Sequence, residues 1–342
     1  MAPQVIVYRY DGSPFATKIE NLLALRNIPY ARVNVPMVPP RKELLLLGIA
    51  YRRIPVVAIG NDVFCDTLMI TQALERAFPG SDAHPSAFPA RKDGGKVDVV
   101  LQTHFSFGYS EKSLFALGTQ SIPWTKVPPA LSQDRFGNMI GGQVPPPGFF
   151  EKLEARVPIT RSALSTHLDY IEEQLSDGRQ WLFDTAAPGY ADVAAHTVFS
   201  WMRGFKSVRE VFAKGVFPRA VTWLDALDAV ISQRRKALSV QTVMADDAAA
   251  RILSGSPSAT HAVGWDEREA GRLGLARGVR VEVTPDDTGK VPTTGTLLGL
   301  TRREILLEIE PPNQSGKKLA VHFPRLGFNV SVPKTKGDKA KL

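Results

Sequence analysis

The N-terminal part of the chain alternates between short apolar runs and amphipathic stretches, and this order constrains the fold more than any other feature of the sequence. Residues 4–10 have the length and β-branched content of a strand, and residues 30–35 alternate as a half-buried strand does. Between them the apolar positions of Phe15–Ile28 form one helical face, and Ser13 followed by Pro14 suits the start of that helix. The pattern predicts two parallel strands joined through a helix.

The next segments extend this unit into a small sheet. A short helix is predicted over residues 40–47, and a strand that the chain enters through a proline over 54–59. The turn that follows leads to a hairpin partner at 63–65, and a further helix is predicted over 68–78. A parallel βαβ unit followed by an antiparallel hairpin is the thioredoxin-like arrangement, so residues 1–80 are predicted to form an α/β domain of that type.

The middle of the chain is predicted to form a second, all-helical domain over residues 81–246. A linker rich in proline, glycine and serine at 80–95 precedes it. An irregular, proline-rich stretch at 121–149 interrupts the helical pattern, and a loop of this length is expected to be a lid, a binding segment or disordered. The clearest predicted helices are 161–175, 191–202 and 220–235.

The last part of the chain has the pattern of a small all-β domain, a barrel or a sandwich, over residues 247–333. Turn signals such as Pro285-Asp286-Asp287 and Ser315-Gly316 separate five short runs with strand character. The remaining residues, 334–342, carry four lysines and are interpreted as a basic, disordered tail. The five predicted strands are 279–283, 295–300, 305–309, 319–323 and 328–332.

The amino-acid composition excludes several classes of protein. The chain has 342 residues, of which 44% are hydrophobic and 22% charged, so it can bury cores and is not a disordered chain. A single cysteine excludes an internal disulfide framework and any multi-cysteine metal centre, and the six histidines show no paired metal spacing, so no metal site is predicted.

Charge and hydropathy patterns argue against two kinds of partner. The net charge of +8 is not arranged as a basic stripe interleaved with aromatic residues, so no nucleic-acid partner is expected. No apolar run approaches the length of a membrane span, and no basic segment followed by an apolar block opens the chain. The sequence therefore predicts no membrane association and a cytoplasmic location.

Three segments that are distant in sequence carry candidate chemistry, because a thioredoxin-like sheet would bring them to one edge. At the helix start of Ser13 and Phe15, backbone N–H groups and the positive dipole end would stabilise a thiolate. At Ile54-Pro55, a cis bond would turn the Ile54 backbone outward to pair with a peptide ligand. Asp66-Thr67, at another helix start, suits a ligand with an ammonium and a carboxylate group.

Four motifs in order along the chain carry a resemblance to a known family. SPFATKIENLLALRNIPY, from Ser13, resembles the catalytic turn and first helix of cytosolic glutathione transferases, and RRIPVVAIGNDVFCDT, from Arg52, resembles their cis-proline strand, hairpin and γ-glutamyl-binding turn. WLFDTAAPGYADVAAHTVFSWM, from Trp181, resembles the segment that nucleates their helical domain, and FPRAVTWLDAL, from Phe217, resembles the helix that follows it. Over about residues 4–235 the chain is similar to a serine-type glutathione transferase.

The resemblance implies glutathione as the cofactor, with its thiol activated at Ser13. Ser13 matches the family's serine or cysteine position, whose hydroxyl in serine-type members hydrogen-bonds to the glutathione sulfur. Ile54-Pro55 would hold the cysteinyl backbone, and Asp66-Thr67 matches the acidic–hydroxyl pair that holds the γ-glutamyl end. Arg41 falls where some members place a cation for the glycine carboxylate, with Lys42 as the neighbouring alternative.

The resemblance also implies a pocket for an electrophilic co-substrate. His104, Phe107 and Tyr109 lie on the first long helix of the predicted helical domain, which lines the electrophile site in this fold, and Tyr10 is a further pocket candidate. Tyr8 or Tyr10 could supply a phenol in place of the Ser13 hydroxyl, as in other classes of the family.

Several of these candidate residues also have a purely structural interpretation. Ser13 and Asp66 could each be only a helix N-cap, and Tyr8 could be a core residue of its strand. Cys65 is interpreted as a packed free cysteine, because it has no CxxC partner. Arg135 could reach the pocket or form a surface ion pair. Residues assigned a structural role are the helix-capping Asp192 and the core tryptophans Trp181, Trp201 and Trp223.

The sequence also departs from the family's pattern. The usual Glu-Ser pair is Asp66-Thr67, the stretch at 121–149 is long, and ordinary members lack the β-rich region. These departures favour a dedicated enzyme, such as those of fungal biosynthetic pathways, over general detoxification. The sequence thus predicts a glutathione-dependent transferase or isomerase acting on a hydrophobic small-molecule electrophile, compatible with a homodimer. The alternative is a non-catalytic binding or adaptor module.

Overall fold

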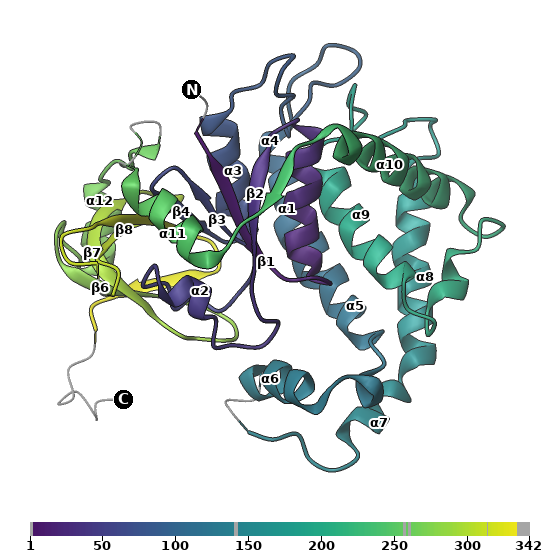
Figure 1. Cartoon of the computed structure of the whole chain (residues 1–342). Coiled ribbons are helices and arrows are strands. Elements are labelled where there is room, and N and C mark those ends of the chain that lie inside the picture. The colour runs from purple at the N-terminus through teal and green to yellow at the C-terminus, as the bar shows by residue number, and fades with distance from the viewer. Residues whose placement is uncertain (1–2, 140–142, 256–257, 259–260, 313, 334–342) are drawn as a thin grey trace. The chain divides into compact units, whose positions relative to one another are not determined.

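The computed structural model of the chain describes residues 3–139, 143–255, 258, 261–312 and 314–333 (Figure 1). The chain divides into two compact units. The first, the sheet unit, comprises Met1–Asp11, Tyr30–Phe78 and Val240–Leu342, and the second, the helical unit, comprises Gly12–Pro29 and Pro79–Ser239. The tail predicted over 334–342 lies outside the described residues.

The N-terminal strands of the sheet unit have the predicted thioredoxin-like order. β1 (Val5–Arg9) pairs in parallel with β2 (Tyr30–Asn34) and antiparallel with β3 (Val56–Ile59), which forms a hairpin with β4 (Asp62–Cys65). Gly60 forms the hairpin turn at φ 65°, a conformation that glycine adopts without steric cost. The local pattern of apolar runs and turn residues therefore predicted these strands correctly.

The predicted β-rich C-terminal region is confirmed, and it continues the N-terminal sheet. β9 (Leu319–Pro324) pairs in parallel with β4, with Asp62 opposite Ala320. The result is one ten-stranded sheet of order β10-β6-β7-β8-β9-β4-β3-β1-β2-β5. Every pairing among the added strands is antiparallel: β6 (Arg280–Pro285) pairs with β7 (Thr293–Leu300) and with β10 (Phe328–Ser331), and β8 (Glu304–Ile309) pairs with β7 and β9.

The sheet also gains a strand at its other edge. β5 (Val240–Thr242) pairs in parallel with β2, although the sequence analysis placed these residues in the helical domain. Three residues are too few to show the alternation by which a strand is recognised in a sequence. The helices of this unit are α2 (Lys42–Leu45), α3 (Thr67–Ala77), α11 (Ala245–Ser254) and α12 (Glu267–Leu273).

A buried polar network ties the added strands to the N-terminal ones. His322 on β9 is fully buried, with Nδ1 2.8 Å from Glu304 Oε1 and Nε2 3.0 Å from Asp62 Oδ1. Arg76 on α3 contacts both oxygens of Glu304, at 2.9 and 3.1 Å. Carboxylates only accept hydrogen bonds, so both ring nitrogens of His322 carry hydrogen and the ring is an imidazolium. The network therefore balances two buried anions with two cations.

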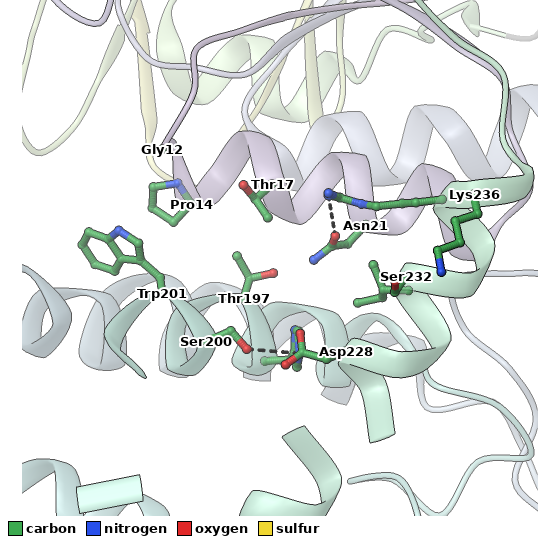
Figure 2. A pocket seen from close by; sticks show the side chains of 13 residues that line it. Gly12, Pro14, Thr17, Asn21, Thr197, Ser200, Trp201, Asp228, Ser232 and Lys236 are labelled. Carbon is green, nitrogen blue, oxygen red and sulfur yellow. Dashed lines mark hydrogen bonds and ion pairs between the residues drawn. The ribbon is translucent and has the colours of Figure 1, made fainter. Parts of the chain in front are cut away.

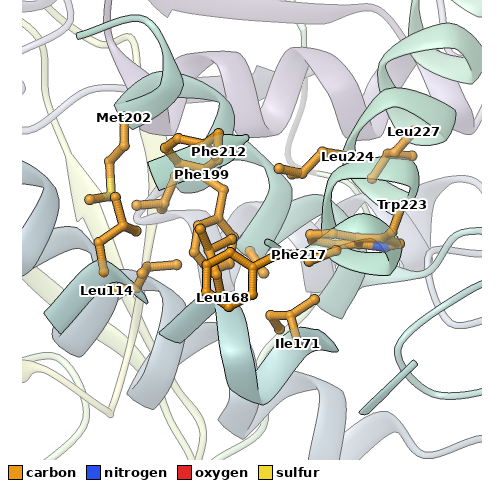
Figure 3. Packing of buried hydrophobic residues seen from close by; sticks show 14 of the residues in the cluster. Leu114, Leu168, Ile171, Phe199, Met202, Phe212, Phe217, Trp223, Leu224 and Leu227 are labelled. Carbon is orange, nitrogen blue, oxygen red and sulfur yellow. The ribbon is translucent and has the colours of Figure 1, made fainter. Parts of the chain in front are cut away.

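The helical unit is built around one apolar core. Side chains from α8, α9 and α10 interdigitate there, among them Leu168, Phe199 and Trp223 (Figure 3). α1 packs against α9 and α10 in the same unit. The helices are α1 (Pro14–Leu25), α4 (Val99–His104), α5 (Phe115–Gln120), α6 (Pro129–Met139), α7 (Phe149–Glu154), α8 (Val157–Gln174), α9 (Tyr190–Arg203) and α10 (Pro218–Ala237). A π-helical segment, Phe105–Leu114, joins α4 to α5.

The stretch at 121–149, predicted to be irregular, contains a helix. α6 begins at Pro129, and proline is tolerated in the first turn of a helix because its missing N–H would have no intrahelical partner there. Phe136 on α6 packs against Trp124 and Phe149, with ring centroids 4.7 and 5.1 Å apart. The prolines of this stretch therefore mark helix boundaries, and the aromatic residues form a local core. Among the described residues, no helix is both long enough and apolar enough to cross a bilayer.

Candidate functional site

The predicted site residues fall in both compact units. Ser13 and Phe15 belong to the helical unit, whereas Tyr10, Arg41, Ile54-Pro55 and Asp66-Thr67 belong to the sheet unit.

Ser13 is the N-cap of α1. Its side chain is 2% exposed, its backbone is extended (φ −76°, ψ 113°), and its Oγ accepts a hydrogen bond from the amide of Ala16 at 3.2 Å. The amide of Phe15 precedes the first intrahelical hydrogen bond, which runs from Thr17 to the Ser13 carbonyl. No acidic residue lies in the first turn of α1, so the positive end of the helix dipole is not compensated there. This geometry is that of an N-cap, and it also suits an anion.

Aromatic rings surround the same helix start. The ring of Phe15 lies 4.6 Å from that of Phe115 on α5, centroid to centroid, and Phe115 stacks on Trp201 of α9 at 5.5 Å. Trp201 contacts Phe205 in turn, at 5.0 Å. All four rings are partly exposed, so the row gives the N-terminus of α1 an apolar neighbour without burying it.

The two other predicted turns lie in the sheet unit. The peptide bond Ile54-Pro55 is cis, as the sequence analysis expected. Asp66 caps α3 from a positive φ of 80°, and its Oδ1 accepts a hydrogen bond from the amide of Leu68 at 2.9 Å. Thr67 is buried, and its carbonyl accepts a hydrogen bond from the hydroxyl of Thr71 at 2.8 Å. Asp66 is therefore an N-cap as well as a candidate for ligand binding.

Arg41 is engaged by its own loop. Its Nε donates to the carbonyl of Pro36 at 2.9 Å and one terminal nitrogen to the carbonyl of Met37 at 3.0 Å, while the other donates to the carbonyl of Arg52. The guanidinium also lies over the ring of Tyr10, 5.6 Å from its centroid. Binding a glycine carboxylate at Arg41 would require some of these hydrogen bonds to be exchanged, so the residue first of all orders the loop that precedes the cis-proline.

Arg53 is a candidate that the sequence analysis did not single out. It precedes Ile54, and it forms an ion pair with Asp287 and donates to the carbonyl of Thr288 at 2.8 Å. Burial would raise the pKa of Asp287, but the hydrogen bond from Arg53 outweighs this effect and lowers it. Both partners lie in the sheet unit, so the loop between β6 and β7 of the C-terminal region reaches the segment of the cis-proline. No local sequence signal joins positions 53 and 287.

Tyr8, the alternative to Ser13, and Cys65, interpreted as a packed cysteine, are both core residues. Tyr8 is fully buried, burial raises the pKa of its hydroxyl, and this hydroxyl has no hydrogen-bond partner among the described residues. Cys65 is a buried free cysteine, and burial raises the pKa of its thiol. A thiol or phenol that is hard to ionise is a poor nucleophile or activator, so both fit their structural interpretation.

Asp192 and Arg135 also make contacts within the protein. Asp192 is buried and accepts hydrogen bonds from the amides of Leu182 (2.8 Å) and Gly189 (2.9 Å) and from Nε1 of Trp223 (3.0 Å). Burial nevertheless raises the pKa of Asp192 to about 6. Arg135 forms an ion pair with Asp134.

The three pocket candidates of the helical unit have different surroundings. His104 is exposed, Phe107 lies under the ammonium of Lys112 at 4.4 Å, and Tyr109 packs on the core with its hydroxyl 3.2 Å from Nδ1 of His167. A cavity of about 620 Å³ lies instead between α1, α9 and α10 (Figure 2). His104, Phe107 and Tyr109 do not line it; they lie on α4 and the π-helical segment, which contribute no residue to its walls.

The comparisons with known proteins agree with this geometry. Residues 7–82 match the model of the glutathione S-transferase N-terminal domain. A GST-like protein from Pseudomonas syringae is 21% identical and has a TM-score of 0.69, and the match covers 97% of this chain and 100% of that one. Residues 7–82 are thus a glutathione S-transferase N-terminal domain by sequence, and nearly the whole chain has the fold of a GST-like protein. The Pseudomonas match spans the C-terminal strands as well.

Other matches to solved structures are weaker. Rice GST1, solved in complex with glutathione, is 17% identical with a TM-score of 0.48, and the match covers 74% of this chain and 96% of that one. The beta-etherase LigF from Sphingobium sp. strain SYK-6 is 15% identical with a TM-score of 0.48, covering 69% and 100%. Residues 129–236 match a domain of unknown function (DUF7962). No curated protein matched the chain.

Proposed function

We propose that this chain is a serine-type, glutathione-dependent transferase or isomerase in which Ser13 activates the thiol of glutathione. The observation that carries the proposal is the position of the Ser13 hydroxyl. Its oxygen accepts from the amide of Ala16 at 3.2 Å, and this leaves the hydroxyl hydrogen to be donated to a thiolate. Ser13 also opens α1 within the segment that matches the glutathione S-transferase N-terminal domain.

The available interactions are large enough for thiol activation. A free thiol has a pKa of about 8.5, and lowering it to about 7 requires about 2 kcal/mol in favour of the thiolate. A hydrogen bond to a charged group contributes about 1.5–3 kcal/mol and a helix N-terminus about 0.3–1 kcal/mol. The hydroxyl of Ser13, the amide of Phe15 and the dipole of α1 therefore supply the required energy together.

The sheet unit would hold the remainder of the tripeptide. The backbone of Ile54 would pair with the cysteinyl residue of glutathione, as an added strand does. Asp66 and Thr67 would bind the γ-glutamyl ammonium and carboxylate at the start of α3. We assign Arg53 as an additional cation for a glutathione carboxylate, held in place by Asp287.

Two outcomes follow from one attacking step. The thiolate donates an electron pair to an electrophilic carbon of a hydrophobic co-substrate and forms a carbon–sulfur bond. In conjugation, a leaving group departs with its bonding pair, or the carbanion formed takes up a proton. In isomerisation, the double bond to which the thiolate has added is now a single bond and can rotate. The carbon–sulfur bond then breaks, which restores the double bond and regenerates glutathione thiolate.

The test combines binding with thiolate titration. Isothermal titration calorimetry of the full chain with glutathione measures binding, and the ultraviolet absorbance of the thiolate against pH gives the pKa of the bound thiol. Ser13→Ala is expected to raise that pKa by about one to two units and to slow conjugation of a chloronitrobenzene about 10- to 100-fold near pH 6.5. Ser13→Thr, which keeps both the hydroxyl and the N-cap, is the matched control and is expected to retain most of the activity.

Two results would contradict the proposal. If the wild-type chain does not bind glutathione at millimolar concentration, the fold serves as a non-catalytic binding module. If Ser13→Ala leaves the thiol pKa and the rate unchanged, Ser13 is only a helix cap and Tyr10 becomes the candidate for thiol activation.

A further inference from the structure

One face of the added strands β6, β7 and β8 carries a polar cavity of about 690 Å³. The register places Arg280, Thr296 and Glu308 in a row across the three strands. Their neighbours in the chain, such as Val281 and Leu297, are buried on the other face of the sheet. The volume lies within the range of sites that bind small organic molecules. The polar lining includes Arg280, Thr294, Thr296, Glu308, Glu310 and Lys318.

Two opposite charges in this polar cavity have no ion-pair partner. Arg280 is exposed, and its side chain forms no hydrogen bond or ion pair with the described residues. Glu310 accepts from the amide of Gly316 at 3.1 Å, but no cation of the described chain pairs with it, since Lys318 pairs with Glu308 at 2.9 Å. Two strand spacings and two residues along β8 separate Arg280 from Glu310, or about 12 Å between their Cα atoms. The space between the two side chains therefore suits a small group that carries both charges.

A second, apolar cavity adjoins the polar one. It has a volume of about 300 Å³, and Glu308 and Lys318 line both cavities. Its walls include the half-buried side chains of Leu298 and Leu306, together with Ala320 of β9. A molecule with one polar and one apolar part can therefore lie across the two cavities.

A buried histidine lies at the β4 end of the apolar cavity. The ring of His261 packs on that of Phe64 in β4, with centroids 4.9 Å apart. His261 is 2% exposed, and neither ring nitrogen has a hydrogen-bond partner in the described part of the chain. Burial lowers the pKa of His261 to about 4, so at neutral pH one nitrogen donates and the other accepts. Because buried polar groups are nearly always paired, this ring indicates a missing polar partner.

We propose that the two cavities form one binding site for a free α-amino acid whose side chain is aromatic and ends in a hydroxyl group, as in tyrosine. Arg280 binds the carboxylate, because its planar guanidinium matches the two carboxylate oxygens. Glu310 accepts from the ammonium group. The aromatic ring packs on Leu298 and Leu306, and its hydroxyl group pairs with His261.

The charges of the polar cavity favour a zwitterion over a simple ion. Arg280 and Lys318 are balanced by Glu308 and Glu310, so the lining as a whole attracts neither an anion nor a cation. A ligand with both charges can instead satisfy Arg280 and Glu310 together. The hydroxyl groups of the two threonines between these residues supply further hydrogen bonds.

The site is distinct from the one proposed for glutathione. None of Ser13, Arg53, Ile54 or Asp66 lines either cavity. The inference therefore does not rest on thiol activation, and saturating glutathione is expected to leave amino-acid binding unchanged.

The experiment measures binding of L-tyrosine to the full chain by isothermal titration calorimetry at low salt. L-phenylalanine lacks the hydroxyl group and is expected to bind about two- to tenfold more weakly, the effect of one hydrogen bond. Tyramine lacks the carboxylate and 3-(4-hydroxyphenyl)propanoate lacks the ammonium group. Each is expected to bind about tenfold more weakly or less, because a charge-assisted hydrogen bond is lost.

Substitutions assign each part of the ligand to its residue. Arg280→Gln and Glu310→Gln are each expected to weaken L-tyrosine binding about tenfold or more, and glutamine at 310 keeps an acceptor for the amide of Gly316. His261→Phe keeps a ring on Phe64 and is expected to abolish the preference for L-tyrosine over L-phenylalanine. Arg303→Gln is the matched control, since Arg303 is exposed in the same unit and lines neither cavity. Circular dichroism melting confirms that each variant is folded.

Any of four results would overturn the proposal. L-tyrosine might show no saturable binding at millimolar concentration, or tyramine or the propanoate could bind as tightly as L-tyrosine. Arg280→Gln could weaken binding no more than Arg303→Gln, or His261→Phe could leave the preference for L-tyrosine intact. Displacement of L-tyrosine by glutathione would instead place both in one site, which also contradicts the proposal but leaves the activation of glutathione at Ser13 untouched.

Discussion

The buried network around His322 provides a direct test of how the C-terminal strands are joined to the sheet. Asp62→Asn removes one anion while it preserves the shape of the side chain. Asp62 Oδ1 lies 3.0 Å from His322 Nε2, and its Oδ2 accepts from the amide of Ser258 at 2.8 Å. In the variant, an asparagine amide group would face either the ring N–H or the amide of Ser258, so one pair of donors would oppose each other.

Asp62→Asn replaces one carboxylate oxygen by an amide nitrogen, and the expected loss of folding stability is nevertheless large. His322, Asp62, Glu304 and Arg76 carry two positive and two negative charges, and the variant leaves one positive charge uncompensated. Removing one partner of a buried ion pair costs about 3–5 kcal/mol. Arg76 remains paired with Glu304, and an asparagine oxygen can still accept one hydrogen bond, so we expect the low end, about 3 kcal/mol.

The stability that the network contributes is expected to fall as the pH rises. Burial would lower the pKa of His322, but the hydrogen bonds to Asp62 and Glu304 outweigh it and raise the pKa above the unfolded value of about 6.5. The folded state then binds more protons above pH 6.5, so this contribution is complete below pH 6.5 and is lost as the pH rises through the folded pKa. His261, whose ring lies 6.3 Å away, does not share this transition, because burial lowers its pKa to about 4.

The assay is urea unfolding followed by circular dichroism from pH 6 to pH 9, with nitrogen-15 NMR of the histidine rings. The difference in stability between wild type and Asp62→Asn should be largest at pH 6 and should shrink toward pH 9. The double variant Asp62→Asn/His322→Leu should regain part of the loss, because it leaves no buried imidazolium. A wild-type His322 with a single N–H at pH 7, or a stability difference below about 1 kcal/mol at every pH, would refute this account of the network.

Three further predictions concern the helical unit and the cis-proline segment. Lys18→Met should destabilise the chain by about 3 kcal/mol in thermal melts, because buried Lys18 is paired with Glu111, and Lys18→Met/Glu111→Gln should recover part of that loss. Asp192 should titrate near pH 6 in NMR experiments; its folded pKa is raised above about 3.9, so its ionisation should reduce stability as the pH rises from about 4 to 6. Asp287→Ala should raise the KM for glutathione several-fold with kcat unchanged, since Arg53 loses its ion-pair partner, and an unchanged KM would exclude Arg53 from the proposed site.

Local features of the sequence predicted local structure well. Ser13 followed by Pro14 marked the start of α1 because both residues act within one turn of the chain. The five C-terminal strands were found because turn residues separate short runs that each have strand character. The cis bond at Ile54-Pro55 was expected from the resemblance to glutathione transferases.

Contacts between distant residues could not be predicted in the same way. Nothing near Asp62 indicates that it pairs with His322, which lies 260 positions later in the chain. The same holds for Arg53 with Asp287, and for the cavity of the helical unit, whose walls come from three helices. A single sequence gives the type of each element, whereas these contacts depend on which faces of the elements meet.

The pairing of β9 with β4 limits how this protein can be shortened. A chain that ended near residue 246 would keep the segment matched as a glutathione S-transferase N-terminal domain and β5, but would lose β6 to β10, the five strands that continue the sheet from β4. Its β4 would then present unsatisfied backbone groups along an open edge, which promotes aggregation. Attempts to isolate the catalytic part by truncation should therefore yield insoluble material, and studies of the C-terminal strands require point substitutions in the intact chain.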